Sequence, residues 1–348
     1  MIAETAVAPV TVGLVVVTYN STAEIERCLQ AIRSQTRKPD RIVIADSGSA
    51  DGTLRLVEST CARIGLTVEL MPFAENVGFA VANNRAVAAL DDCGLVALLN
   101  PDAFPEAGWL TALVDAAASH PEAASFASRL MVAGETDVLD GAGDTFHVSG
   151  LAWRVGHGEA LGRVSDARRA GPVFSACAAA ALYRRDDWQQ VGGFDERFFC
   201  YVEDVDLGFR LQLLGRTCRY IPEAVAYHVG SAVSGVDSPF SVYHGYRNLE
   251  WTFLKDMPSR LLWRYLPLHL VAVLAQVFWF VPKSRGGSLF RAKWDALRQF
   301  GAVLGDRRRV QATRVVSVEA LRSMLDRTPL AKRFARVKEH QETKTRQP

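Results

Sequence analysis

The sequence predicts an α/β fold with a mostly parallel, doubly wound sheet and an α-helical tail. Two observations support this expectation. Over the first 130 residues, apolar runs rich in β-branched residues alternate with segments of helical periodicity, an order typical of parallel sheets covered by helices. Residues 255–348 differ in kind, because they carry 20 Lys and Arg against 7 Asp and Glu around a long apolar segment.

The first expected strand, 12–18, is a β-branched run without polar breaks, as in a strand that is buried on both faces. The four expected strands are 12–18, 41–45, 67–71 and 95–99. The helices expected between them are about 22–35, 53–64 and 76–90. Residues 130–175 are Gly-rich and irregular, which predicts short strands joined by loops. A further strand is expected over 219–227, directly before His228.

Polar loops follow these strands, and we expect them to meet at one edge of the sheet. They are 18–20, 46–52, 76–78 and 100–102. Ligands of doubly wound sheets bind beyond the carboxyl ends of the strands. Acidic side chains there can accept hydrogen bonds from a base or a ribose, and amides at helix starts can face phosphate. Helix capping is the plainer alternative, for Asp51 in particular.

A cluster of carboxylates is predicted at the start of a helix that ends near Gly215. The apolar residues of this helix recur every three to four positions, which gives it one buried face. Glu203, Asp204 and Asp206 therefore gather at its N-terminus. The helix dipole stabilises anions there by about 0.3–1 kcal/mol. N-terminal capping explains such a cluster, but an ionised carboxylate is also the right group to take a proton from an attacking hydroxyl.

Asn100, Pro101 and Asp102 follow the expected strand 95–99. A single carboxylate at a strand end suits a hard divalent cation that is already bound to phosphates, because Mg²⁺ uses only one or two protein carboxylates in such sites. The alternative is a simple turn. His228 is a candidate for a further ligand, and neutral imidazole suits Mn²⁺ better than Mg²⁺. A lone histidine is more often an ordinary core or surface residue.

The tail predicts contact with an anionic membrane surface. Its apolar segment, 265–281, is accompanied by tryptophans and flanked by Lys and Arg, the composition of a surface anchor. A buried helical hairpin is the alternative, and the short length and Gln276 argue against a full span. Nucleic acid is not an expected partner, because the charges flank an apolar segment and form no aromatic-studded groove.

The remaining composition favours a cytoplasmic location. The six cysteines show no metal-ligand or redox spacing, so we expect reduced and mostly buried thiols. The N-terminal stretch lacks the charged start of a signal peptide and runs into the first expected strand.

Taken together, these motifs resemble the family 2 glycosyltransferases, a GT-A family. The matching elements are VVVTYN (15–20), IADSGSADGT (44–53), NVGFAVANN (76–84), LLNPDAF (98–104), GGFDERFFCYVEDVDLGFRL (192–211) and His228. The chain looks most like the bacterial rhamnosyltransferases of cell-wall and surface-polysaccharide assembly, on the basis of NPDAF and of YRNLEWTFLKDMP (246–258) before the apolar tail.

The resemblance implies a role for each matching residue. Thr18, Tyr19, Asn20 and Asp46 would hold the nucleoside of a nucleotide-sugar donor, and Asn76, Gly78 and Asn83 would shape the donor pocket. Asn100 and Asp102 stand at the family's Asp-x-Asp, with Asp102 and His228 as ligands of Mg²⁺ or Mn²⁺. Asp204 would be the catalytic base of an inverting transfer, and Glu203 would orient the acceptor. Asn100 departs from the family pattern because its amide adds no charge, which puts strict metal dependence in doubt.

The resemblance also suggests how the chain is organised and where it works. Residues 1–240 would form the GT-A domain, and residues 241–348 a basic helical region. The expected donor is dTDP-rhamnose, with UDP-sugars second, and the acceptor a glycan or polyprenyl-linked glycan at the inner face of the plasma membrane. The alternatives are a sugar nucleotidyltransferase, which normally has a Gly-rich basic loop after its first strand, and an inactive nucleotide-sugar-binding protein, which would be expected to lose the Glu203–Asp204 pair.

Overall fold

A computed structural model describes residues 10–165, 167–230 and 238–332. Its strands are β1 (Val12–Thr18), β2 (Arg41–Asp46), β3 (Glu69–Pro72), β4 (Leu95–Leu99), β5 (Ala103–Pro105), β6 (Ala123–Val132), β7 (Leu139–Ala142), β8 (Asp144–Phe146), β9 (Ala152–Arg154), β10 (Gly171–Val173), β11 (Ala180–Arg184) and β12 (Thr217–His228). Its helices are α1 (Ile25–Arg33), α2 (Thr53–Ile64), α3 (Phe79–Ala89), α4 (Trp109–Ser119), α5 (Arg185–Val191), α6 (Glu203–Leu213), α7 (Pro239–Asp256), α8 (Ser259–Phe280), α9 (Gly286–Arg298), α10 (Phe300–Ala312) and α11 (Val318–Met324).

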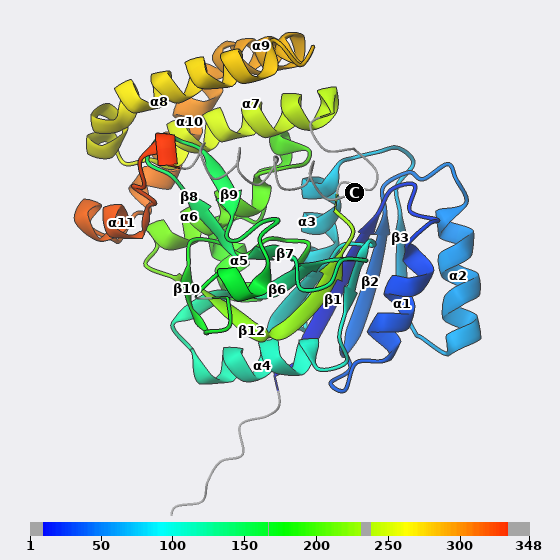
Figure 1. Cartoon of the computed structure of the whole chain (residues 1–348). Coiled ribbons are helices and arrows are strands. Elements are labelled where there is room, and N and C mark those ends of the chain that lie inside the picture. The colour runs from blue at the N-terminus through cyan, green and yellow to red at the C-terminus, as the bar shows by residue number, and fades with distance from the viewer. Residues whose placement is uncertain (1–9, 166, 231–237, 333–348) are drawn as a thin grey trace, which may run out of the picture.

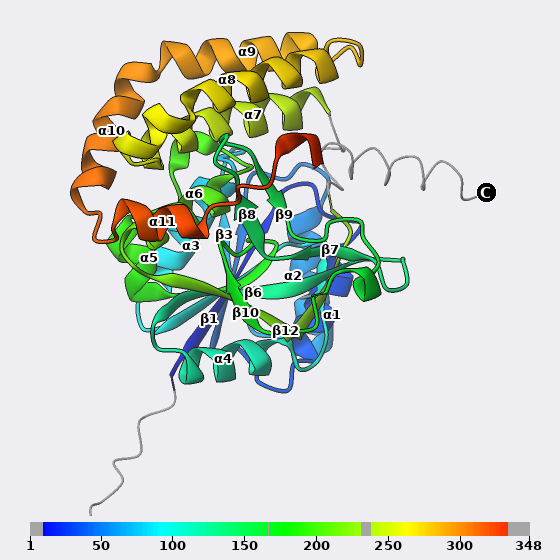
Figure 2. The same cartoon turned by 60° about the vertical axis from the view of Figure 1, so that its left-hand side comes forward.

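The central sheet has the order β10-β12-β6-β11-β4-β1-β2-β3 (Figures 1 and 2). Strands β4, β1, β2 and β3 pair in parallel, as predicted for the first half of the chain. Strand β11 lies antiparallel between β4 and β6, while β6 and β12 are again parallel. The irregular segment contributes β7 at the margin of the sheet and the separate β8–β9 hairpin.

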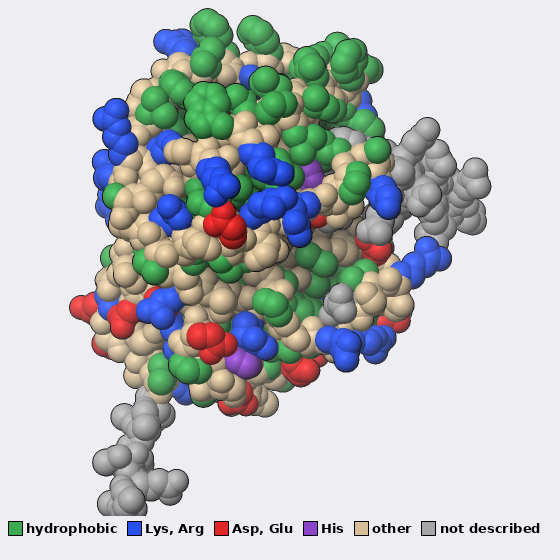
Figure 3. Space-filling view, turned by 90° about the vertical axis from the view of Figure 1, so that its left-hand side faces the viewer, with side chains coloured by type: hydrophobic (Ala, Val, Ile, Leu, Met, Phe, Trp, Pro, Cys, Tyr) green, Lys and Arg blue, Asp and Glu red, His purple; other side chains and the backbone are tan. Residues whose placement is uncertain are grey.

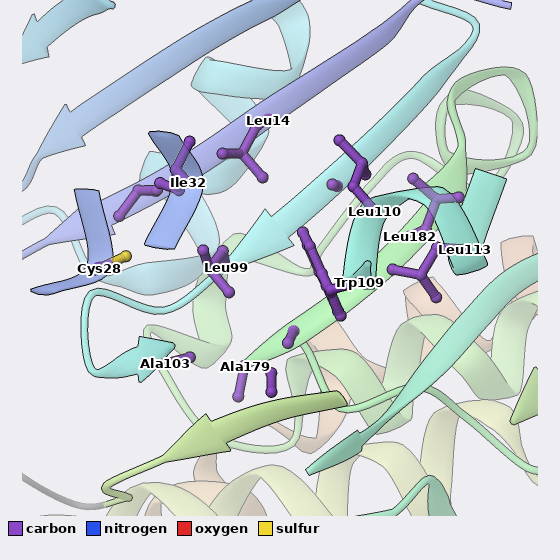
Figure 4. Close-up of a cluster of buried hydrophobic side chains, with 14 of the residues drawn as sticks. Leu14, Cys28, Ile32, Leu99, Ala103, Trp109, Leu110, Leu113, Ala179 and Leu182 are labelled. Carbon is purple, nitrogen blue, oxygen red and sulfur yellow. The ribbon is translucent and has the colours of Figure 1, made fainter. Parts of the chain in front are cut away.

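Helices cover both faces of the sheet, and each face has its own apolar core. On one face, α1, α2 and α4 pack against the strands through residues such as Ile32, Val57 and Leu113. Figure 4 shows part of this cluster around Leu99 and Trp109. On the other face, α3, α5 and α6 contribute residues such as Ala86 and Leu211. This double cover explains why β1 and β4 have no exposed position.

Short pairings bring distant parts of the chain to the carboxyl edge of the sheet. Strand β5 pairs with the end of β12, so that His228 lies opposite Ala103, one residue after Asp102. The backbone N–H of Asn100 donates to the carbonyl of Ala179 at 2.8 Å, just before β11. The NPD turn, the start of β11 and the end of β12 therefore meet at one place.

The C-terminal helices form a layer beyond α6. Helix α7 lies next to α6, and α8 and α9 lie on its outer side (Figures 1 and 2). Helix α8 begins at Ser259 and passes through Pro267. By length and composition α8 could cross a membrane, and 22% of its most apolar window is buried. All six cysteines are free thiols, and five of them are buried.

Candidate functional site

A cavity of about 930 Å³ opens at the carboxyl edge of the sheet, against the start of α6 and the side of α7. Of the predicted site residues, its walls include Tyr19, Asn76, Gly78, Asn100, Asp102, Glu203, Asp204 and His228. Thr18, Asn20, Asp46 and Asn83 are not among the lining residues. The structure therefore brings the predicted metal, base and acceptor residues to one cavity and leaves part of the predicted donor set outside its lining.

Asp102, His228 and Asn100 form one corner of the cavity. His228 Nε2 lies 3.4 Å from Asp102 Oδ1 and 3.5 Å from Asn100 Nδ2. Burial raises the pKa of the Asp102 carboxyl, but His228 and the backbone N–H groups of Asp102 and Gly230 outweigh it, so the pKa is lowered. Asp102 is thus ionised at neutral pH.

Asp140 holds the other nitrogen of His228. Its Oδ2 lies 2.8 Å from His228 Nδ1 and also binds Arg154, whose side chain reaches it from β9. Burial raises the pKa of Asp140, but Arg154, His157 and His228 overcome that effect and lower it strongly. A carboxylate on the far nitrogen orients a metal-binding imidazole and leaves Nε2 facing the ligand.

These donors suit a divalent cation that is shared with a phosphate-bearing substrate. The Asn100 Oδ1 atom is buried without a hydrogen-bond partner among the described residues, so the residue whose Nδ2 approaches His228 also has an oxygen that could serve as a ligand. Within the same part of the chain, no three His, Cys, Asp or Glu side chains gather into a metal site. A cation held here would take its remaining ligands from phosphate and water.

Asp204 lines the same cavity from the start of α6. Its Oδ2 accepts a hydrogen bond from the backbone N–H of Ala178 at 3.0 Å, and its Oδ1 accepts one from Val205 at 2.8 Å. Ala178 directly precedes Ala179, whose carbonyl binds Asn100. One short segment therefore sets the base candidate relative to the metal corner.

Two further acids near Asp204 have raised pKa values. Burial raises the pKa of Glu203, and the charge of Asp204 raises it further. Glu203 is 5% exposed, and its Oε2 has no hydrogen-bond partner among the described residues. The pKa of Asp144, at the start of β8, is also raised by burial and by the charge of Asp204. Both acids therefore favour the neutral, proton-donating form, while Asp204 faces the cavity between them.

The predicted donor residues form a tightly bonded group. Thr18 Oγ1 donates to Asp46 Oδ1 at 2.7 Å, and Ser49 donates to the same carboxylate through its N–H and its hydroxyl. Asn20 Oδ1 accepts from the N–H of Ala50. Asp46 is 3% exposed, so its carboxylate shapes the loop at the strand end from inside.

The predicted donor-pocket residues Asn76, Gly78 and Asn83 lie on and before α3. Asn76 Oδ1 accepts from Ser47 Oγ at 3.1 Å and from the N–H of Gly78 at 3.0 Å. Gly78 has φ +84°, and a Cβ there would lie 2.6 Å from the ring of Phe199. Asn83 is buried and donates to the carbonyl of Phe79. Tyr19, which instead follows β1, is 36% exposed at the rim of the cavity.

Several residues of the cavity were not predicted from the sequence. Asp144, Trp153 and Arg154 enter from the β8–β9 hairpin, and Leu249 from α7. The hairpin lies in the stretch predicted only as irregular, which offers no periodic signal. Segment 246–258 was noted for its resemblance alone, and nothing in it indicated contact with the carboxylates.

The arrangement can deprotonate a hydroxyl beside a leaving group that carries negative charge. The carboxylate of Asp204 and the cation-binding corner line one cavity, which is large enough for two small substrates. The neutral acids beside Asp204 can donate hydrogen bonds to a polar acceptor, and the loops after β1 and β2 present the edge at which nucleotides bind in such sheets.

Comparison with known proteins places this site in a family context. Residues 14–192 match the family model Glycosyl transferase family 2, and residues 152–294 match Glycosyl transferase family group 2. A similar protein is the N-acetylglucosaminyl-diphospho-decaprenol L-rhamnosyltransferase of Mycobacterium tuberculosis, which is 32% identical over 279 residues, covering 74% of this chain and 87% of that protein.

Solved structures show the same fold. The mannosyltransferase PcManGT from Pyrobaculum calidifontis, in complex with GDP-Man and Mn²⁺, superposes with a TM-score of 0.55 over 92% of this chain and 88% of its own, at 19% identity. GalNAc-T7 with UDP, GalNAc and Mn²⁺ gives a TM-score of 0.59 over 72% of this chain and 49% of its own, at 15% identity.

Proposed function

Because this chain belongs to glycosyl transferase family 2 and has the GT-A fold, we propose that it transfers rhamnose from dTDP-rhamnose to a polyprenyl-linked glycan with inversion at the anomeric carbon. The chain itself is a nucleotide-sugar-dependent glycosyltransferase. The sugar and the acceptor are inferred from the mycobacterial relative, and UDP-sugars are the second choice of donor.

The position of Asp204 supports this proposal most strongly. It faces the cavity from the N-terminus of α6, while Asp102 and His228 face the same cavity from the sheet edge. The donor diphosphate would lie toward Asp102, and the acceptor would enter on the side of Glu203 and Asp204. Such an arrangement would set the attacking oxygen and the leaving group on opposite sides of the sugar.

In this mechanism Asp204 takes the proton of the acceptor hydroxyl as its oxygen bonds to the anomeric carbon. The bond from that carbon to the diphosphate oxygen breaks, and the electron pair leaves with the nucleoside diphosphate. Glu203, kept neutral by burial and by Asp204, would donate a hydrogen bond to the acceptor and so orient it. Asp102 and His228, whose ring is oriented by Asp140, would hold Mg²⁺ or Mn²⁺. The cation would supply positive charge to the diphosphate.

The first experiment measures nucleoside-diphosphate release from a panel of nucleotide sugars, with and without Mg²⁺ or Mn²⁺. We expect release from dTDP-rhamnose with a polyprenyl-linked acceptor. Asp204→Asn should lower kcat by about 10²–10⁴-fold while donor binding stays near normal. Asp186→Asn, an exposed carboxylate in the first turn of α5, is the matched control. Full activity of Asp204→Asn would refute the base assignment.

We also propose that the helical layer rests on the cytoplasmic face of the plasma membrane. The "apolar cap" is the set of exposed hydrophobic residues on α8 and α9: Trp263, Leu270, Val271, Leu274, Val277, Phe278, Phe290, Trp294 and Leu297. Figure 3 shows hydrophobic side chains gathered over this layer, with Lys and Arg side chains below. Apolar and aromatic groups bordered by cations are suited to the interface of an anionic bilayer.

Vesicle sedimentation tests the membrane proposal. The wild-type chain should sediment with vesicles that contain phosphatidylglycerol at physiological salt. Phe278→Asp with Phe290→Asp removes the most exposed hydrophobic side chain of each helix, 79% and 72% exposed, and should leave most of the protein in the supernatant. Val315→Asp, 76% exposed but outside α8 and α9, should still sediment. A wild-type chain that ignores such vesicles would refute the proposal.

For the chain as a whole, we propose that residues 1–240 form the glycosyltransferase domain and residues 241–348 the membrane-associated region. Residues 333–348 lie outside the described part of this region. The charge division between the two parts favours two working environments, an aqueous cavity and a lipid surface.

A further inference from the structure

We propose that Asn248 of α7 is a positioning residue for catalysis, which holds the strained segment that leads into Glu203 and Asp204. The inference rests on the proposed role of Asp204 as the base. It assigns a part in catalysis to the 246–258 motif, which the proposed mechanism does not otherwise use.

The segment before α6 has a backbone that ordinary residues avoid. Phe199, Tyr201 and Val202 have φ values of +67°, +69° and +72°. Left-handed conformations are unfavourable for residues with a Cβ, and for a β-branched residue such as Val202 they are exceptional. Such strain persists only where surrounding contacts over-determine the backbone, and it concentrates at functional sites.

Asn248 supplies those contacts from the other side of the sequence. Its side chain is fully buried, and its Nδ2 lies 3.0 Å from the carbonyl oxygen of Phe198, 3.0 Å from that of Cys200 and 2.8 Å from that of Tyr201. One amide group therefore gathers three carbonyls of the strained segment. These carbonyls converge only while the positive φ angles are kept.

Arg247 fixes the orientation of this amide. Its Nε donates to Asn248 Oδ1 at 3.0 Å, so Nδ2 must face the strained segment. Its Nη2 donates to the carbonyls of Arg197 and Phe198, both at 3.0 Å. The guanidinium also lies over the ring of Trp251, 4.3 Å from its centre. Two adjacent residues of α7 thus bind a continuous stretch of backbone before the catalytic carboxylates.

The strained segment passes this constraint to Asp204. The carbonyl of Val202 accepts the first hydrogen bond of α6, from the N–H of Asp206 at 2.9 Å. On its other side, the carbonyl of Phe199 accepts from Ala80 at the start of α3. If Asn248 is lost, the segment can relax toward negative φ and turn the start of α6. Asp204 would then move relative to the acceptor, while the residues around Asp46 keep their bonds.

The test replaces Asn248 with Asp, which has the same shape but lacks the two N–H donors of the amide. We expect kcat to fall at least tenfold, while the donor Kd, measured by calorimetry, stays within twofold of wild type. Thr252→Val, one turn along α7, removes a buried hydroxyl that binds only the carbonyl of Asn248 and should keep wild-type kcat. If Asn248→Asp is insoluble, Asn248→Ala is assayed in the same way.

Rescue separates positioning from general damage. Glycine adopts positive φ without strain, so Val202→Gly in the Asn248→Asp or Asn248→Ala background should restore part of the lost kcat. Unchanged kcat in the single variant, an equal loss of donor binding, or no rescue by glycine would each overturn the inference. An inactive Asp204→Asn with a normal Asn248→Asp would reject this inference alone, whereas a fully active Asp204→Asn would reject the proposed base.

Discussion

The two sides of the cavity are constructed in different ways. On the side that we propose for the donor, polar groups are bound between loops at neighbouring strand ends, as in the Thr18–Asp46 bond between β1 and β2. On the acceptor side, Asp204 sits on a helix whose entry is held by α7, by α3 and by the segment before β11. The donor side therefore follows from the sheet, whereas the acceptor side depends on contacts between distant segments.

Gly78 lies where the two sides meet, and Gly78→Ala should have the largest effect of the four substitutions that follow. With φ +84° a Cβ is strained, and it would lie 2.6 Å from the ring of Phe199 and 2.8 Å from its carbonyl oxygen. A displacement of about 1 Å at the acceptor side lowers activity by about 10²-fold, which a kcat measurement would reveal. Gly65→Ala also has positive φ but meets no atom within 4 Å, so it should keep its activity. Equal losses in both variants would contradict the contact argument.

Asp140→Asn tests the residues that hold His228 beside Asp102. Asp140 holds His228 Nδ1 and Arg154 at once, and loss of such an orienting carboxylate weakens metal affinity by about 10–100-fold. We expect the Mn²⁺ concentration for half-maximal activity to rise by that factor, with kcat largely recovered at saturating Mn²⁺. Asp137→Asn, an exposed position on the preceding loop, serves as the control. An unchanged Mn²⁺ requirement would show that His228 needs no such partner.

Glu203→Gln tests whether the acceptor side works with a neutral acid. Burial and the charge of Asp204 raise the pKa of Glu203, so glutamine reproduces the form that we expect in the folded protein. Its kcat should stay within about tenfold of wild type, since one hydrogen bond contributes about 1 kcal/mol. Glu203→Ala should lose more, mainly in acceptor KM. If Glu203→Gln and Glu203→Ala are equally inactive, the reaction requires the ionised form of Glu203.

Glu250→Gln should affect stability and leave kcat unchanged. Burial raises the pKa of Glu250, but Lys293 and His269 outweigh it and lower the pKa to about 2, from an ordinary 4.5. The stabilisation is present above pH 4.5 and disappears as the pH falls toward 2. The free energy of unfolding, measured with urea, should be about 1–3 kcal/mol lower in the variant than in the wild type at pH 7. This difference between variant and wild type should be smaller at pH 3. Glu319→Gln, in an exposed ion pair with Arg260, should change little.

The same contrast explains how much the sequence predicted. Strand-end loops are local, so the parallel strands, the loop at 100–102 and the helix that starts at Glu203 were predicted from periodicity and turn residues. The antiparallel β11 was not, because its pairing partners are far away in the chain, and the β8–β9 hairpin was not, because its short strands show no periodic pattern. Asp140 reaches His228 across 88 positions, and Asn248 reaches Tyr201 across 47. Neither link leaves a periodic pattern.

Helix α7 has a practical consequence for preparing this enzyme. Asn248 on one side of α7 binds the turn before Asp204. On the other side, Glu250 of α7 pairs with His269 of α8 and Lys293 of α9. A fragment that stops near residue 240 would lose the apolar cap and Asn248 together. A version that stays in solution without detergent is therefore better made by replacing the outward side chains of the apolar cap with polar ones than by shortening the chain.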